Sequence, residues 1–487
     1  MKTNSLIRIK FGRIFFPVFP AAAALLFGLA VPPTLAGAEV FTVALTGKYP
    51  PFSFYSPAGE LVGFDVDISR AIAGRLGRES EFVTTEWDGI LAGLLAGKYD
   101  AIIGSMAVTP ERAKKVIFSR PYYLSGAQLF IHRKDRDKIK TIADCRGRNI
   151  GVGLGETYEH FLRENYPGIN TVSYKGTVDT FQDMLNRRLA GFVTDRLVGL
   201  YQVNQGEMPF VPAGPLLYQE KMAIPVTREN TVLAGEIDEA LKSLQEDGTL
   251  AEIREKWFGA AARETARGSA IPPRTAAEML LKGFGITLLV AFTSILLGFI
   301  LSVPGGWILN NHPPLLYHLV RSFNDFIRGT PLLIQLFFVY FGAPQLGLVL
   351  SPIQAAIFTL TVNTSAYMAE VVRSGLMAVG PGQRKAGIAL GLSPFQVFRF
   401  VVWPQAFRIA LPPLMNTVVA LIKDTALIAM ISVGEVIREA QSIISVTYDP
   451  MKYYFIVAAM FFLVTFPLMK LAGKIEKNIR ARGFTNA

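Results

Sequence analysis

The chain has 487 residues, which is longer than a typical single domain. Hydrophobic residues make up 51%, charged residues 18%, and the mean hydropathy is +0.34, which argues against a wholly soluble protein and for a membrane or part-membrane protein. The net charge of +11 does not indicate nucleic acid binding, because no basic stripe is interleaved with aromatic residues, and a membrane surface explains it better.

The first 38 residues have the pattern of an export signal. Basic residues precede an apolar run at 14–31, and the stretch LAGAE follows with alanines in an A-x-A arrangement. This pattern predicts a signal peptide cleaved after Ala38, with an uncleaved anchor helix as the alternative. In either case the following residues are expected to face the outside of the cell. The single cysteine, Cys145, excludes an internal disulfide, and the scattered histidines predict no metal site.

Residues 39–258 have the composition of a soluble α/β domain. Short apolar stretches such as VFTVAL and DAIIGS alternate with helical patterns such as FDVDISRAIAGRLG, in which Asp65 is expected to cap the helix. This alternation predicts parallel sheet built from βαβ units, with a second set beginning near Ile150. The stretches GAQLFIHRKD and KMAIPVTREN are expected to cross between two hinged lobes. The expected boundaries are about 40–130 with 225–258 for lobe 1, and about 131–224 for lobe 2.

A linker and a membrane domain are expected after the α/β domain. Residues 259–277 are small, polar and proline-containing, which predicts a linker. The remainder, 278–487, has five apolar stretches that each have room for the roughly 20 residues that cross a bilayer. They lie near 283–309, 319–348, 352–377, 406–434 and 452–473. The expected fold class is therefore an α/β two-lobed domain followed by an all-α membrane domain of about five transmembrane helices.

Basic residues predict how the chain crosses the bilayer. If the first span enters from outside, the inner segments carry twelve Lys and Arg residues and the outer loops carry two. The outer two are Arg438 and Lys452, and the inner ones are Arg321, Arg328, Arg373, Arg384, Lys385, Arg399, Arg408, Lys470, Lys474, Lys477, Arg480 and Arg482. The positive-inside rule thus agrees with the export signal and predicts a multi-pass protein with its α/β domain outside.

The stretch GQRKAGIALGLSPFQVFRFVVWPQA, residues 382–406, is amphipathic and too charged to span the bilayer. It predicts a helical pair on the inner face at about 380–403 that contacts a soluble partner, with a helix lying on the lipid headgroups as the alternative.

The spacing in this stretch resembles the inner-membrane permease motif of ABC importers, Glu-Ala-Ala, three residues, Gly, nine residues, then aliphatic-x-Leu-Pro. The matching positions are Lys385, Ala386, Gly387, Gly391, Val401, Trp403 and Pro404. Lys385, Gly387 and Trp403 depart from the usual Glu, Ala and Leu, and the missing acid puts one polar contact in doubt. The resemblance implies coupling helices that dock on a separate ATP-binding subunit. The flanking IRGTPLLIQLFFVYFG, NTSAYMAEVVRSGL and LIKDTALIAMISVGEV resemble the polar amino-acid branch of these permeases.

The α/β domain resembles the amino-acid-binding family of periplasmic substrate-binding proteins. The resemblance rests on YPPFSF, GFDVDI, VTPERAKKVIFSRPYY, GVGLGET, FVTD and ALKSLQEDGTLAEIREKWFG. Together the two resemblances imply ATP-driven import of a polar amino acid across the bacterial inner membrane by a fused binding protein and permease. No G-x-x-x-x-G-K-[ST] occurs, so the chain is expected to be a transporter subunit, not an enzyme, with no cofactor of its own. A second copy or a related permease is the other expected partner.

The carboxylate and ammonium of an amino acid determine the residues expected at the site. Arg112 follows a good N-cap, Thr109, and the resemblance makes it the carboxylate clamp, because a guanidinium binds carboxylates bidentately. Thr157 begins a helix whose N–H groups favour an anion. Asp195 ends a strand at the carboxyl edge of the sheet and matches the ammonium-binding aspartate of the family, with a loop-capping role as the alternative.

Other positions match family residues around the ligand. Tyr49 and Trp87 match the aromatics that sandwich the ligand side chain, although by themselves both read as core residues. Ser105 and Ala107 match positions that bind the ammonium and carboxylate, and Ala107 offers only its backbone N–H. For specificity, Thr46 stands where binders of basic amino acids and of glutamine often have aspartate, while Glu156 stands where Ser or Thr is common. These two residues favour different ligands, so the sequence predicts a polar amino acid but does not identify which one.

Ionisable residues at apolar depth predict a translocation path, since charges in lipid are costly. Asn363, Tyr367 and Glu370 follow i, i+4, i+7 and share a helix face, where we expect contact with the passing substrate. Lys423 and Asp424 are further candidates, with anchoring at the interface as the alternative.

Two other function classes fit parts of this pattern. A ligand-gated channel uses the same binding fold but inserts its pore between the lobes and has a filter-like loop, and no TVGYG appears here. An enzyme on the binding fold would not explain five spans and a coupling segment.

Overall fold

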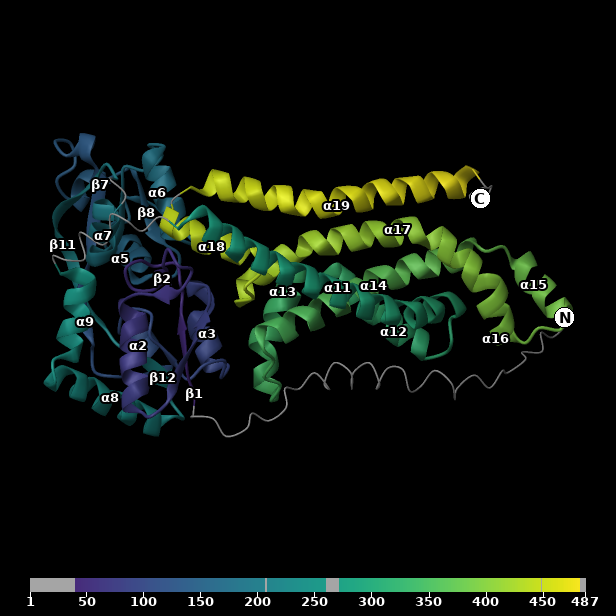
Figure 1. Ribbon diagram of the computed structural model, residues 1–487, viewed down its shortest axis with the longest axis horizontal. Helices are drawn as coiled ribbons and strands as arrows, with labels where there is room; N and C mark the ends of the chain where they lie inside the picture. Colours follow the sequence, from purple (N-terminus) through teal and green to yellow (C-terminus); the bar gives the residue numbers. More distant parts are fainter. Residues whose placement is uncertain (1–39, 206–207, 260–270, 448, 482–487) are drawn as a thin grey trace.

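A computed structural model describes residues 40–205, 208–259, 271–447 and 449–481. The expected signal peptide, 1–38, and residues 260–270 of the expected linker lie outside the described residues. An α/β domain occupies one end of the molecule, and a helical bundle extends from it (Figure 1).

Lobe 1 of the α/β domain contains a five-stranded sheet in the order β4-β1-β5-β12-β6. Strand β1 pairs in parallel with β4 and β5, as the predicted βαβ units require, whereas β12 is antiparallel to β5 and β6. The elements of this lobe are β1 (Val40–Leu45), β2 (Phe54–Tyr55), β3 (Leu61–Val62), α2 (Phe64–Arg75), β4 (Glu79–Thr84), α3 (Trp87–Leu95), β5 (Ala101–Ile102), α4 (Pro110–Ala113), β6 (Val116–Phe118), β12 (Pro225–Thr227), α8 (Thr231–Glu246) and α9 (Thr249–Phe258).

Lobe 2 contains a second mixed sheet in the order β11-β7-β10-β8-β9. Its elements are β7 (Tyr123–His132), η1 (Arg133–Asp135), η2 (Ile142–Cys145), β8 (Asn149–Gly153), α5 (Thr157–Asn165), β9 (Asn170–Tyr174), α6 (Thr177–Leu185), β10 (Gly191–Asp195), α7 (Arg196–Gln205) and β11 (Phe210–Met222). The chain passes between the sheets twice, from β6 to β7 and from β11 to β12. The second crossing lies within the predicted stretch KMAIPVTREN, but the first comes before the predicted stretch GAQLFIHRKD, which is part of β7 and η1, so lobe 2 begins earlier than expected. In lobe 1 the returning strand β12 is antiparallel to β5 and β6, and in lobe 2 β7 is antiparallel to β10 and β11, so neither sheet is purely parallel.

A buried polar cluster in lobe 1 sets the backbone at the cleft between the lobes. Asp65 is fully buried and accepts hydrogen bonds from Ser105 Oγ (2.8 Å) and the Tyr122 hydroxyl (2.8 Å). The expected capping role of Asp65 is wrong, because α2 is preceded by Gly63 and Asp65 lies in its first turn. The cluster holds Ser105 at φ 56, a left-handed conformation that a serine rarely adopts without such support. Burial raises the pKa of Asp65 to about 7, against the effect of both hydroxyl donors.

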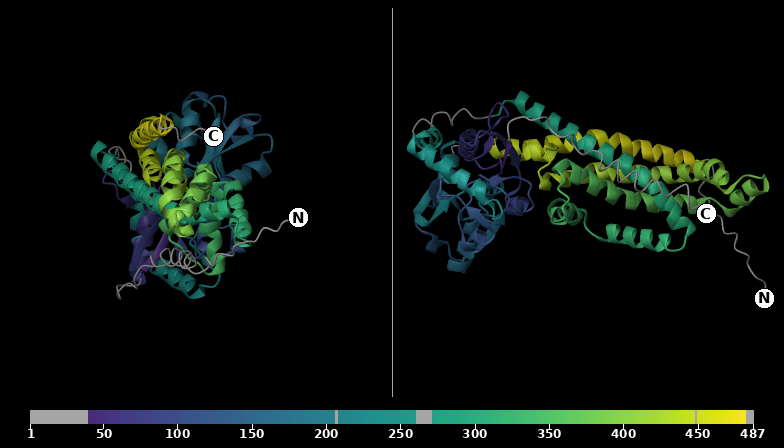
Figure 2. Two further views of the ribbon diagram at one scale, coloured as in Figure 1. Left: turned by 90° about the vertical axis from the view of Figure 1, so that its right-hand side faces the viewer. Right: turned by 90° about the horizontal axis from the view of Figure 1, so that it is seen from below.

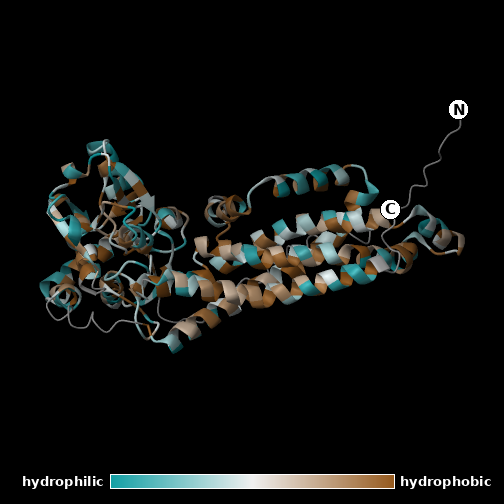
Figure 3. Cartoon of the chain, turned by 90° about the horizontal axis from the view of Figure 1, so that it is seen from above, coloured by the Kyte–Doolittle hydropathy of each residue, from teal (hydrophilic) through white to brown (hydrophobic). Residues whose placement is uncertain are grey.

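The second half of the chain is a bundle of long helices whose elements run from α11 to α19. They are α11 (Pro273–Asn311), α12 (Leu316–Gly329), α13 (Leu332–Phe337), η4 (Phe338–Gly342), η5 (Ala343–Leu346), α14 (Pro352–Ala378), α15 (Pro381–Ala389), α16 (Pro394–Gln396), η6 (Val397–Val402), α17 (Trp403–Asp424), η7 (Thr425–Ile431), α18 (Val436–Thr447) and α19 (Pro450–Ala481). Figure 2 shows the bundle end-on and from below, and Figure 3 shows many hydrophobic residues along its helices.

Within the described residues, four helices are long and apolar enough to cross a membrane: 273–311, 352–378, 394–431 and 450–479. The expected span at 319–348 is instead broken into α12, α13, η4 and η5. The break falls at Thr330, which is extended (φ −115, ψ 145) because it precedes Pro331. The expected span at 406–434 begins earlier, because the second helix of the amphipathic pair runs directly into it.

Small residues allow the bundle helices to approach closely. A Cβ at Gly306 of α11 would lie 2.6 Å from Val372 of α14, and one at Gly375 of α14 would lie 2.7 Å from the carbonyl oxygen of Ala406 in α17. Close backbone approach is the usual way that membrane helices gain packing contacts, since lipid supplies no hydrophobic driving force between them.

Gly375→Val is therefore expected to lower the free energy of unfolding of the bundle by about 1–3 kcal/mol through overpacking. Gly285→Val is the matched control, because Gly285 is exposed in the middle of α11 and has open space where a Cβ would lie. Both changes add the same β-branched side chain to a helix. Thermal unfolding of the purified full-length protein in detergent measures the difference, and equal melting temperatures for the two variants would contradict the packing account.

Candidate ligand-binding site

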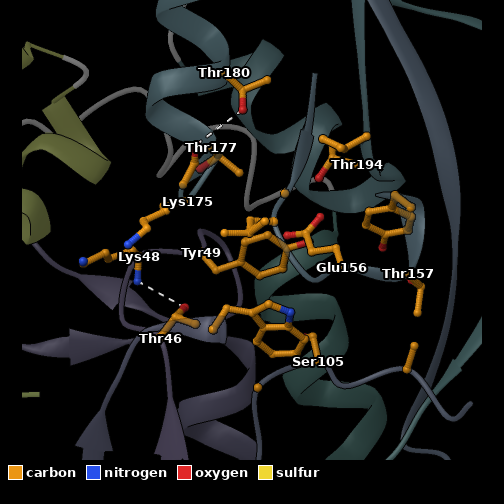
Figure 4. Close-up of a pocket in the computed structure, with 18 of the residues that line it drawn as sticks. Thr46, Lys48, Tyr49, Ser105, Glu156, Thr157, Lys175, Thr177, Thr180 and Thr194 are labelled. Carbon is orange, nitrogen blue, oxygen red and sulfur yellow. Dashed lines mark hydrogen bonds between the residues drawn. The ribbon is translucent and has the colours of Figure 1, made fainter. Parts of the chain in front are cut away.

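One pocket lies in the cleft between the lobes, and most of the residues predicted to bind the ligand line it (Figure 4). Those residues are Thr46, Tyr49, Trp87, Ser105, Ala107, Arg112, Glu156 and Thr157. The first six belong to lobe 1 and the last two to lobe 2, so both lobes contribute walls. The pocket is thus built from segments that are more than 100 residues apart in the sequence.

Arg112 bridges the two lobes. Thr109 caps the short helix α4 by accepting from the Arg112 backbone N–H (3.2 Å), as the sequence predicted. The guanidinium donates to the carbonyl oxygen of Ala107 in lobe 1 (3.0 Å) and lies 3.5 Å from that of Gly155 in lobe 2. It also lies over the ring of Trp87, 5.6 Å from the ring centroid. This cation can therefore receive a carboxylate while it holds the cleft closed.

Two carboxylates face Arg112 from lobe 2. Glu156 precedes α5 and folds back over Gly153, where a Cβ would lie only 2.1 Å from the Glu156 carboxyl carbon. Burial, followed by the charges of Glu220 and Asp195, raises the pKa of Glu156 to about 8. Burial also raises the pKa of Glu220, although the hydroxyls of Thr157 and Tyr218 oppose the shift. These acids are suited to receive a cationic group of a ligand.

Asp195, the predicted ammonium-binding residue, is not among the residues that line this pocket. It is buried at the end of β10, and its Oδ1 accepts from the backbone N–H of Leu197 (2.7 Å) at the start of α7. This is the capping role that the sequence left open as the alternative. Its neighbour Thr194 does line the pocket, and burial raises the pKa of Asp195 to about 6.

The two predicted aromatic residues lie at the pocket from different elements of lobe 1. Tyr49 stacks on Phe52, with ring centroids 5.7 Å apart, and lies between Lys48 and Glu156 in Figure 4. Trp87 begins α3 and faces Arg112. An apolar ligand side chain would meet these rings.

Charged lining residues that the sequence did not single out are Lys48, Glu86, Lys175 and Glu220. Lys48 donates to Glu86 Oε1 (2.6 Å), and these two residues directly precede Tyr49 and Trp87 in the chain. Proximity to the matched aromatics was the only signal that could have found them. Glu220 lies in β11, directly before the stretch KMAIPVTREN that the sequence marked as a crossing.

The segment predicted to couple with an ATP-binding subunit lies at the end of the bundle opposite the α/β domain (Figure 1). Gly387 is buried in α15, and a Cβ there would lie 3.0 Å from Val397 of η6, so the two arms of the pair touch where the family has alanine. Gly391 turns the chain at φ 77, and Pro404 lies in the first turn of α17. Lys385 and Ala386 are exposed, as are Ile388, Leu390, Phe395 and Phe400.

The residues predicted for a translocation path lie in two places. On α14, Asn363 donates to Gln335 Oε1 (3.0 Å), Tyr367 lies under the Arg328 guanidinium, and Glu370 pairs with Arg373. Asn363 is buried at the junction of α12 and α13, where Gln335 also donates to the Ile327 carbonyl oxygen (2.7 Å). These partners give the α14 residues a structural role beside any contact with substrate. Lys423 and Asp424 end α17 at the opposite, α/β-domain end, where Lys423 is exposed.

Two family models match successive parts of the chain. Residues 41–260 match bacterial extracellular solute-binding proteins, family 3. Residues 294–481 match the inner membrane component of binding-protein-dependent transport systems.

Individual relatives match one half of the chain each. The L-cystine-binding protein TcyJ of Escherichia coli is 36% identical over 45% of this chain and 82% of its own length. The glutamine transport system permease protein GlnP of Escherichia coli is 34% identical over 44% of this chain and 97% of its own length. Among solved structures, an ancestral arginine-binding protein bound to glutamine is 35% identical over 46% of this chain and 100% of its own, with a TM-score of 0.44. The chain therefore belongs to the family 3 solute-binding proteins through its first half and to the binding-protein-dependent inner membrane permeases through its second.

Proposed function

We propose that this chain is the fused substrate-binding and permease subunit of an ABC transporter that imports a polar amino acid. The observation that carries the proposal is Arg112, which connects both lobes beside Trp87 in the pocket of a domain joined to a permease. A half-buried guanidinium with acids opposite it matches the carboxylate and ammonium of a free amino acid.

The charges in the pocket favour a polar amino acid. When the ligand carboxylate binds Arg112 and its ammonium binds one acid, the other of Glu156 and Glu220 is left for a donor on the ligand side chain. Relatives of each half handle such ligands: TcyJ is named for L-cystine and GlnP for glutamine. In proposing the class of ligand, we therefore give Glu156 more weight than the uncharged Thr46. Asp195 Oδ2 is buried without a hydrogen-bond partner, so Asp195 can accept from an ammonium while Oδ1 keeps its bond to Leu197.

ATP hydrolysis belongs to a separate subunit in this proposal, because the chain has no P-loop sequence. The exposed apolar residues Ile388, Leu390 and Phe400 beside Lys385 form a surface that a soluble protein would cover. We infer that this surface binds the ATP-binding subunit on the inner face of the bacterial cell membrane. A second copy of the chain, or a related permease, completes the path through the bilayer.

Calorimetric titration of the full-length protein against the twenty amino acids and L-cystine tests the proposal. One polar amino acid is expected to bind, and Arg112→Gln is expected to weaken that binding by about 2–5 kcal/mol, since it removes one partner of a buried charge pair. Arg120→Gln is the control, because Arg120 is a surface residue of lobe 1 whose guanidinium lies 3.9 Å from Asp238. Binding of none of these compounds, or equal affinity in Arg112→Gln, would contradict the proposal.

The raised pKa of Glu156 predicts that affinity increases with pH. The empty pocket holds Glu156 protonated below about pH 8, and a cationic group of the ligand has to displace that proton. The affinity is therefore expected to rise about tenfold per pH unit as the pH approaches 8 from below, and to level off above it. Glu156→Gln should remove this dependence. Titrations of both proteins across this range measure the slopes, and parallel slopes would show that Glu156 does not face a cation of the ligand.

A further inference from the structure

One short helix of the permease touches both lobes of the binding domain. Helix α18 packs with α11 in a cluster that also includes Tyr55 of lobe 1 and Val178 of lobe 2. It lies where the bundle meets the α/β domain in Figure 1. The same helix therefore contacts each side of the cleft that holds the candidate ligand site.

Arg438 of α18 reaches the mouth of that cleft. Its guanidinium donates to Glu86 Oε1 (2.6 Å) and to the carbonyl oxygen of Thr46 (3.2 Å), both in lobe 1. Glu86 Oε1 accepts from Lys48 as well, and Lys48 Nζ donates in turn to Gln441 of α18 (2.6 Å). The Arg438 side chain is 3% exposed and that of Glu86 is 12% exposed, so solvent screens this pair little.

The same groups belong to the ligand pocket. Thr46, Lys48 and Glu86 line it, and the residues that follow Lys48 and Glu86 are the aromatics Tyr49 and Trp87. On the lobe 2 side, the pocket residue Lys175 lies 3.7 Å from Met430 Sδ of η7. The permease thus borders the pocket at its mouth.

We propose that Arg438 is the permease residue that anchors the docked binding domain, because it binds Glu86 and the Thr46 carbonyl at the mouth of the ligand cleft. This inference rests on the proposed function. In the docked arrangement the ligand faces the permease beside this anchor. A guanidinium suits the role, because it donates to a carboxylate and a carbonyl at once. Helix α18 orients it firmly, since Glu435 Oε1 accepts from the Arg438 backbone N–H (2.8 Å).

The anchor is expected to matter because docking buries both charges. Without Arg438, Glu86 would keep Lys48 as a partner. Glu86 Oε1 and the Thr46 carbonyl oxygen would each lose the Arg438 guanidinium as a donor, and in the docked arrangement solvent cannot replace it. Truncating one partner of such a hydrogen-bonded charge pair acts chiefly on how fast the surfaces separate.

Cross-linking within the full-length chain measures docking at a contact separate from the anchor. A Cβ at Gly89 of α3 would lie 3.1 Å from the Phe341 ring of η4, so Gly89→Cys with Phe341→Cys reports docking of lobe 1. The pair is placed in a Cys145→Ser background, which removes the one native thiol. A short bis-maleimide is added to purified protein in nanodiscs, and the cross-linked fraction is measured without ligand or ATP.

Arg438→Gln is expected to lower the cross-linking rate at least about tenfold. Lys452→Gln, which neutralises an exposed cation near the same end of the bundle, should leave it unchanged. Glu86→Arg with Arg438→Glu should restore cross-linking relative to either change alone, which a folding defect in α18 would not produce. Unchanged cross-linking in Arg438→Gln, no rescue by the exchanged pair, or no cross-linking in the reporter protein itself would overturn the proposal. None of these outcomes depends on whether the domain binds an amino acid.

Discussion

The buried carboxylate of Glu86 connects the two halves of the molecule. It accepts from Lys48 of its own lobe and from Arg438 of the membrane domain, each at 2.6 Å. A buried charge is stable only when its partners are present, because water no longer solvates it. The position of the α/β domain on the bundle therefore depends on these charges together with the apolar contacts of Tyr55 and Val178 beside α18.

The ligand cleft and the amphipathic helical pair lie at opposite ends of the bundle. Arg112 spans the cleft between the lobes, and the cleft mouth lies against α18 at one end of the bundle. The amphipathic pair α15 to η6 lies at the other end, with apolar side chains exposed. Glycines such as Gly306 and Gly375 bring α11, α14 and α17 close together within the bundle.

Local patterns in the sequence predicted much of this arrangement. The cap at Thr109 placed Arg112, and the second crossing was evident from the extended stretch KMAIPVTREN, whereas the first crossing was placed too late in the chain. Hydropathy alone predicted one span across Pro331, where the helix is in fact interrupted between α12 and α13. An apolar stretch has the same hydropathy whether or not its helix is continuous. Residues that meet only through folding were missed: Lys48 and Glu86 are 38 positions apart, and Glu86 and Arg438 are 352 apart. No local pattern marks such pairs.

The most direct test of the account is uptake of the bound amino acid into proteoliposomes that contain this chain and an ABC ATP-binding subunit expressed together with it. The account predicts accumulation against a gradient only when ATP is present on the side of α15. Flux down the gradient without ATP would instead indicate a channel gated by the binding domain, and it would contradict the account.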